Sequence, residues 1–83
     1  MSVKRCTVIL YSIHNVLKAE KVLKKANVHF DLIPVPRGLS SDCGMAVEFN
    51  HADIKMVHDT LVGVDLDIAG IYLNEDRNYK KLI

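Results

Sequence analysis

The 83-residue sequence has little of what marks the most easily recognised classes of protein. It has only two cysteines, too few for a disulfide scaffold, and they lie far apart in the sequence. This usage of cysteine is typical of a protein in a reducing compartment. Its formal net charge is +1, without the concentrated basic excess that nucleic-acid binders usually carry. No apolar run approaches the roughly 18 residues that a membrane-spanning helix requires. These features predict a cytoplasmic protein that binds neither nucleic acid nor membrane.

Motifs for cofactors and metals are also missing. The chain has no GxGxxG, Walker loop or nucleophile elbow. Its two phenylalanines and three tyrosines are too few and too scattered for an RNA-recognition sheet. His51 and His58 are seven residues apart, and two histidines on their own make a poor zinc site. We therefore expect no cofactor and no metal.

The composition itself is that of an ordinary globular protein, with 49% hydrophobic and 25% charged residues. A chain of this length can bury one core and little else. We interpret residues 1–83 as a single domain with its core at about 3–73 and a polar tail at 74–83.

Hydrophobic periodicity divides this core into strands and helices in the order βαββαβ. Ser12 and Asn50 precede the two helical patterns and are candidate N-caps, and Asn27 and Gly63 are candidate stops. The strands are expected at 4–11, 29–35, 45–49 and 67–73, and the helices at 15–26 and between Asn50 and Gly63.

This order predicts an α+β ferredoxin-like sandwich, a four-stranded antiparallel sheet with two helices on one face. Right-handed crossovers place the third strand between the first and second, antiparallel to both. The second strand contains Pro34 and is followed by Pro36, which indicates an edge strand.

In this topology the loop 37–44 and the start of the first helix meet at one end of the sheet. Cys43 is therefore expected near Ser12 and His14. Free N–H groups and the helix dipole at such a position can lower the pKa of a thiol by about one unit or more.

The loop itself offers groups that favour an anion. Gly44 permits a turn with positive φ in which successive N–H groups form an anion-binding nest. Arg37 is either an anion clamp or an ordinary loop arginine, and the neighbouring carboxylate of Asp42 opposes a second negative charge. Judged only from the Ser/Gly-rich composition of the loop, Cys43 can also be a cysteine without a function. Cys6 belongs at the opposite end of the first strand, too far from Cys43 for a disulfide, and is expected to fill the core.

The sequence as a whole resembles a known family. The helix from His14 to Lys24, followed by Pro-Val-Pro-Arg at 34–37 and Ser-Ser-Asp-Cys-Gly at 40–44, is similar to the selenium/sulfur carrier-like family. The resemblance extends from about Val8 to Leu73. It implies that Cys43 is the family's Cys-Gly thiol.

The same resemblance implies that Arg37 and Ser40 match the positions flanking that thiol. It also implies a protein that holds a sulfur or selenium atom on Cys43, with a donor and an acceptor protein as partners. Such a protein is more a carrier or accessory protein than a turnover enzyme.

Two other readings remain open from the residues alone. One is a non-catalytic ligand-binding or assembly module, for which a homodimer through the open sheet face or an edge strand is a common form. The other is a metallochaperone, which would need a second soft ligand beside Cys43, and the loop offers none.

Overall fold

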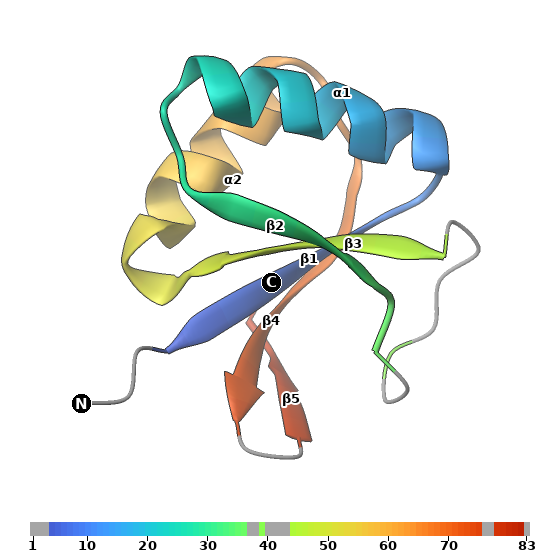
Figure 1. The fold of residues 1–83 in the computed structure, drawn as a ribbon, viewed down its shortest axis with the longest axis vertical. Helices are drawn as coiled ribbons and strands as arrows, with labels where there is room; N and C mark the ends of the chain where they lie inside the picture. The colour runs from blue at the N-terminus through green and yellow to red at the C-terminus, as the bar shows by residue number, and fades with distance from the viewer. Residues whose placement is uncertain (1–3, 37–38, 40–43, 76–77, 83) are drawn as a thin grey trace.

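Two helices lie on one side of an antiparallel sheet in the computed structural model (Figure 1), which describes residues 4–36, 39, 44–75 and 78–82. The elements in chain order are β1 (Arg5–Leu10), α1 (Ile13–Lys25), β2 (Phe30–Pro34), β3 (Met45–Asn50), a 3₁₀ turn (His51–Asp53), α2 (Ile54–Gly63), β4 (Ile68–Glu75) and β5 (Asn78–Lys81).

The sheet order is β2-β3-β1-β4-β5, and every neighbouring pair is antiparallel. The third strand lies between the first and second, as predicted, and β2 is an edge strand. The prediction of four strands is wrong, because β5 lies in the segment predicted to be a polar tail. β5 pairs with β4 from Tyr72↔Lys81 to Glu75↔Asn78. Its sequence, Asn-Tyr-Lys-Lys, has no apolar alternation, so the backbone pairing with β4 defines it.

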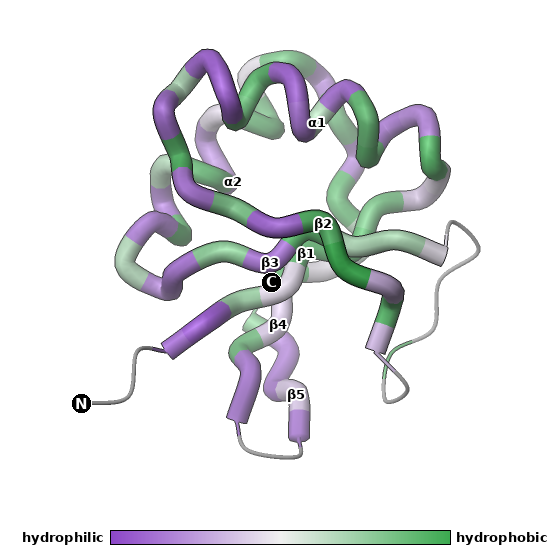
Figure 2. Tube along the Cα trace, in the orientation of Figure 1, coloured by the Kyte–Doolittle hydropathy of each residue, from purple (hydrophilic) through white to green (hydrophobic). Residues whose placement is uncertain are grey.

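The hydrophobic core fills the space between the helices and the sheet. Side chains alternate between the two faces of a strand, so every second residue of β1 faces the helices. Along α1 polar and apolar residues alternate with the helical period (Figure 2), and the apolar side of the helix faces the sheet. The fully buried members of this core are Cys6, Val8, Leu10, Val16, Ala19, Leu23, Val47, Phe49, Val57, Leu61 and Ile71.

The two helices begin differently. Ser12 caps α1, because its Oγ accepts a hydrogen bond from the Asn15 amide at 3.2 Å. Asn50, the second predicted cap, makes no such bond, and α2 is entered through the 3₁₀ turn instead. The Asn50 Oδ1 accepts a hydrogen bond from the Arg5 Nη1 at 2.8 Å, so a partner 45 positions away in sequence takes the place of a local cap.

Both helices end in the same motif. Asn27 follows α1 with a φ of 60°, and the Val28 amide donates to the Leu23 carbonyl at 3.1 Å. Asp65 follows α2 with a φ of 58°, and the Leu66 amide donates to the Leu61 carbonyl at 3.1 Å. These are Schellman-type ends, so Asp65 supplies the left-handed residue that terminates α2.

A polar cluster joins three strands at the end of the sheet where β1 begins. Arg5 binds Glu48 at 3.1 Å and Asp31 at 2.9 Å, in addition to Asn50. We call these four residues the Arg5 cluster. Thr7, the one fully buried polar residue among those described, donates to the Asn74 Oδ1 at 2.9 Å on the same face. The face opposite the helices is therefore cross-linked by side chains from β1, β2, β3 and β4.

No helix in the described part of the chain is long and apolar enough to cross a membrane.

Candidate functional site

Three of the six predicted site residues lie within the described part of the chain. Ser12, His14 and Gly44 are described, and Arg37, Ser40 and Cys43 lie outside the described residues. The activation of Cys43 and the roles of Arg37 and Ser40 therefore stay predictions. The described residues define the framework that holds both ends of the loop 37–44.

Gly44 fixes the C-terminal end of this loop. Its φ is +74°, a left-handed conformation that residues with a Cβ rarely adopt. A Cβ placed on it would have nothing within 4 Å, so the requirement for glycine comes from the backbone and not from lack of space. The sequence indicated that Gly44 permits a positive φ, and the structure has a positive φ there.

Backbone hydrogen bonds close the loop at its base. The Val35 amide donates to the Gly44 carbonyl at 3.2 Å, and Pro34 is paired with Met45 in the adjoining ladder. The Leu39 amide donates to the Pro36 carbonyl at 3.0 Å. The N-terminal and C-terminal ends of the loop are thereby held side by side.

The sheet register places the base of this loop at the end where α1 begins. β1 runs antiparallel to β3 and β4, so the end of β1 lies beside the starts of both. Ser12, which follows β1, and Gly44, which precedes β3, consequently belong to the same end of the sheet (Figure 1). We call it the open end, in contrast to the end that carries the Arg5 cluster.

The first residues of α1 at this open end, Ile13 and His14, are exposed. The Ser12 Oγ is used as the acceptor for the Asn15 amide, so its role in the described structure is to cap the helix. The first turn of α1 contains no acidic residue, so no carboxylate of its own neutralises the positive end of the helix dipole.

His14 lies on the outer face of α1. It is exposed and lines a shallow depression together with Leu17, Lys18, Glu20 and Lys21. No hydrogen bond among the described residues joins His14 to Ser12 or Gly44. The described geometry thus places His14 at the open end, where its neighbours are residues of its own helix.

Cys6 is the described cysteine, and it is fully buried. It is opposite Phe49 on β3 and Leu73 on β4, within the core. Burial raises the pKa of the Cys6 thiol above its ordinary value. Phe49 is five residues from Gly44 along β3, about 16 Å at 3.3 Å per residue. The prediction that Cys6 fills the core at the end away from the loop is confirmed.

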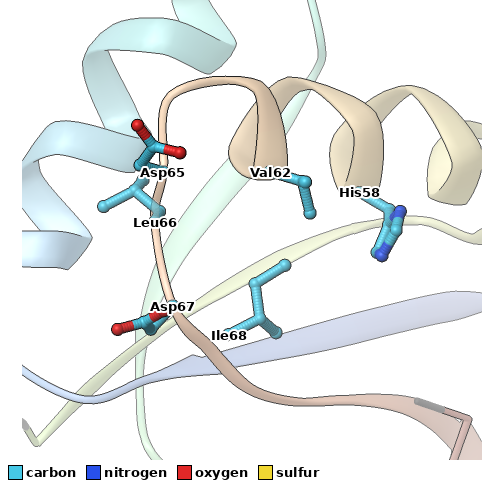
Figure 3. Close-up of a pocket in the computed structure, with 6 residues that line it drawn as sticks. All are labelled: His58, Val62, Asp65, Leu66, Asp67 and Ile68. Carbon is cyan, nitrogen blue, oxygen red and sulfur yellow. The ribbon is translucent and has the colours of Figure 1, made fainter.

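A second depression, of about 400 Å³, lies between α2 and the start of β4 and was not predicted. His58 and Val62 point from α2 toward Ile68, whereas Asp65 and Asp67 point to the other side (Figure 3). The described residues contain no group of three or more His, Cys, Asp or Glu side chains that could hold a metal ion. The imidazole and the two carboxylates do not converge, so this depression offers no catalytic arrangement.

Comparisons with known proteins identify the chain through its family. Neither the curated proteins nor the solved structures contain a match. A family described as "Putative Se/S carrier protein-like" matches residues 5–73, which include β1 through most of β4 and the loop 37–44. The match covers most of the chain, and the chain therefore belongs to this Se/S carrier-like family.

Proposed function

We propose that this protein carries a sulfur or selenium atom on the thiol of Cys43. The observation that carries the proposal is the family match over residues 5–73, a range that includes Cys43 and Gly44. The framework at the open end supports it, because Gly44 and the N-terminus of α1 lie at one end of the sheet. In the ferredoxin-like arrangement proposed for the first four strands, the thiol belongs to the loop between β2 and β3.

The chemistry needs one nucleophilic thiolate. The Cys43 thiolate attacks the terminal sulfur of a persulfide on a donor protein, forming a new S–S bond. The S–S bond of the donor breaks, and the donor sulfur leaves as a thiolate. Cys43 then holds the terminal sulfur as a persulfide, no net oxidation has occurred, and the reverse type of attack by an acceptor thiol removes the atom. Selenium transfer follows the same electron count.

Apart from the Asp42 carboxylate, which opposes a second negative charge, the groups proposed to surround the thiol favour an anion. Arg37 supplies a positive charge, Ser40 a hydroxyl donor and Gly44 a backbone N–H group. The start of α1, with Ser12 and His14, adds the positive end of its dipole. These groups would lower the pKa of the thiol and stabilise the persulfide anion.

The protein would act in the cytoplasm between a donor protein and an acceptor protein. In this role the protein passes a sulfur or selenium atom from one protein to another and does not convert a substrate into a product. The description of a carrier or accessory protein therefore fits it better than that of an enzyme. A thiol held reduced by the compartment is available to accept a sulfur atom.

The pH dependence of alkylation at each cysteine tests the proposal directly. Cys43 should be alkylated with an apparent pKa below about 8.5, the value of a free cysteine. Cys6 is the internal control, because it is buried and should react only on unfolding. An unreactive or unshifted Cys43 would contradict an activated thiol.

Loading with sulfur provides the second test. Wild-type protein incubated with cysteine persulfide should gain the mass of one sulfur atom at Cys43, and Cys43→Ser should not. Equal loading of the two proteins would overturn the proposal and favour a binding or assembly module, in which the sheet face opposite the helices is the working surface.

A further inference from the structure

We propose that the outer face of α1 is the docking surface for an acidic protein partner that exchanges sulfur or selenium with this chain. This inference rests on the proposed carrier function and adds where the partner binds and what its surface is like. The docking surface consists of Ile13, His14, Leu17, Lys18 and Lys21 on α1, together with the exposed Tyr11 two residues before the helix.

Apolar side chains on this surface are exposed to an unusual degree. Tyr11 is 63% exposed, Ile13 47% and Leu17 51%. These are three of the five large exposed hydrophobic residues in the described part of the chain. Ile13 and Leu17 are four residues apart and are neighbours on the helix surface. The buried side of α1 is formed by Val16, Ala19 and Leu23, so Leu17 makes no contribution to the core.

Lysines flank this apolar strip. Lys18 and Lys21 line the same shallow depression as Leu17. α1 holds four of the eleven basic residues of the chain and one of its ten acidic residues, so the remaining sequence has a net negative charge. The one acidic residue, Glu20, is paired with Lys24 at 3.4 Å, which leaves Lys18 and Lys21 without a salt bridge among the described residues. The positive charge of the protein is thus concentrated on α1.

The chemistry of the surface identifies the class of partner. A surface with an apolar centre and a lysine rim is complementary to a protein surface with apolar residues bordered by Asp and Glu. Nucleic acid fits less well, because the net charge of the whole chain is only +1 and because Ile13 and Leu17 on the helix are aliphatic and cannot stack with bases as Tyr11 could.

The position of the surface matches the proposed chemistry. Ile13 begins α1 at the open end, and Lys21 lies about 12 Å farther along the helix at 1.5 Å per residue. Gly44 precedes β3 at the same end of the sheet, so a partner docked at the start of α1 lies at the end where Gly44 lies. Docking on α1 would therefore bring a donor persulfide or an acceptor thiol to the end of the sheet that carries the loop 37–44.

Two synthetic peptide persulfides of equal length test the proposal. One has Glu and Leu at helical spacing around a persulfidated cysteine, and the other has Lys in place of every Glu. At low salt we expect sulfur transfer from the acidic peptide to wild-type protein to be about tenfold faster, and the difference to shrink with added salt. Cysteine persulfide, which is too small to use the docking surface, serves as the reference donor.

Matched variants separate docking from loading. Lys18→Glu with Lys21→Glu should abolish or invert the preference for the acidic peptide and leave loading from cysteine persulfide unchanged. Lys55→Glu with Lys80→Glu is the control, since both residues are exposed and lie on α2 and β5. It makes the same change in net charge and should retain the preference.

The apolar centre has its own control. Leu17→Gln should slow transfer from the acidic peptide severalfold, and Val62→Gln, equally 51% exposed but on α2, should not. An acidic peptide with serine in place of its cysteine should bind wild-type protein in fluorescence anisotropy and bind the Lys18→Glu, Lys21→Glu protein more weakly.

The outcomes distinguish the two proposals. Loading by cysteine persulfide without any peptide preference would overturn docking on α1 and leave the carrier function intact. Failure of all donors to load Cys43 would overturn the carrier function, and the anisotropy measurement would then decide docking by itself. A single-stranded oligonucleotide that binds α1 more tightly than the acidic peptide would overturn the assignment of a protein partner.

Discussion

The two ends of the sheet are constructed differently. Where β1 begins, the Arg5 cluster joins β1, β2 and β3 through side chains at 2.8 to 3.1 Å. Where β1 ends, the chain has an exposed Tyr11, a capped helix start at Ser12 and a left-handed Gly44. The first end is stabilised by long-range side-chain bonds, and the open end by local backbone geometry.

This difference separates stability from the proposed chemistry. Side chains at the open end that are not used to hold strands together are free to contact a partner or an anion. Substitutions in the Arg5 cluster should therefore change the free energy of unfolding without changing thiol reactivity, whereas substitutions at the open end should change both.

The largest effect is expected at the Arg5 cluster. Arg5→Ala removes bonds to Glu48, Asp31 and Asn50, and leaves the half-buried Glu48 carboxylate without its ion pair. We expect a loss of about 2 kcal/mol in the free energy of unfolding, measured by urea denaturation. Lys4→Ala, an exposed neighbour, should change it by less than about 0.5 kcal/mol. Alkylation of Cys43 should be unchanged, and equal losses for the two variants would contradict the role of the cluster.

Gly44→Ala should have the next largest effect. Forcing a residue with a Cβ into the left-handed region costs about 1 to 2 kcal/mol. Gly63→Ala is the control, because Gly63 lies at the end of α2, has no positive φ and has space for a Cβ. The control should be neutral or stabilising by up to about 1 kcal/mol. Sulfur loading should slow in Gly44→Ala alone, and a stabilising Gly44→Ala would show that the positive φ is not required.

Removing the α1 cap should change the free energy of unfolding by less than Gly44→Ala does, and the effect should be confined to one helix. Ser12→Ala should cost about 1 kcal/mol, since the Asn15 amide loses its acceptor. Asp53, which precedes α2, makes no side-chain cap bond, so Asp53→Ala should cost about half as much or less through the helix dipole. Thermal unfolding of both variants measures the contrast, and a larger loss for Asp53→Ala would reverse the assignment of caps.

The smallest effect is the pH dependence contributed by Cys6. Burial raises the pKa of its thiol, so the folded state keeps the proton at a pH where the unfolded chain loses it. This contribution to stability is fully present below the pKa of the unfolded thiol and is lost as the pH rises through the pKa of the folded one. Stability should decline above about pH 8.5, with a slope no steeper than about 1.4 kcal/mol per pH unit. Cys6→Ala should reduce that slope, and an identical slope in the variant would exclude the thiol as its source.

How far the sequence predicts the fold depends on whether the information is local. The period of Val16, Ala19 and Leu23 predicts α1, and Ser12 followed by that period predicts its cap. These elements are correct because a helix period and a capping hydroxyl act over four residues or fewer. The same local logic marks Gly44 as a position that permits a positive φ and Asn27 as a helix stop, and both residues have a positive φ.

Expectations that depended on distant partners were less accurate. Asn50 was predicted to cap a helix, and it binds Arg5 instead, because β1 and β3 are paired at this position. β5 was missed because its polar sequence has no periodicity and forms only against β4. The helix α2 ends at Gly63, as predicted, but the left-handed residue at which the chain reverses is Asp65, two positions later.

For the candidate site, the sequence by itself determined the types of residue: a Cys-Gly pair in a loop, a capping serine and a lysine-rich helix. The predicted topology also placed Gly44 and the start of α1 at one end of the sheet and Cys6 in the core. Tertiary structure alone decided that Leu17 is exposed among lysines and that Asn50 binds Arg5. The physical reason is that backbone propensities are set by neighbouring residues, whereas burial and juxtaposition are set by which strands pair and which helix face meets the sheet.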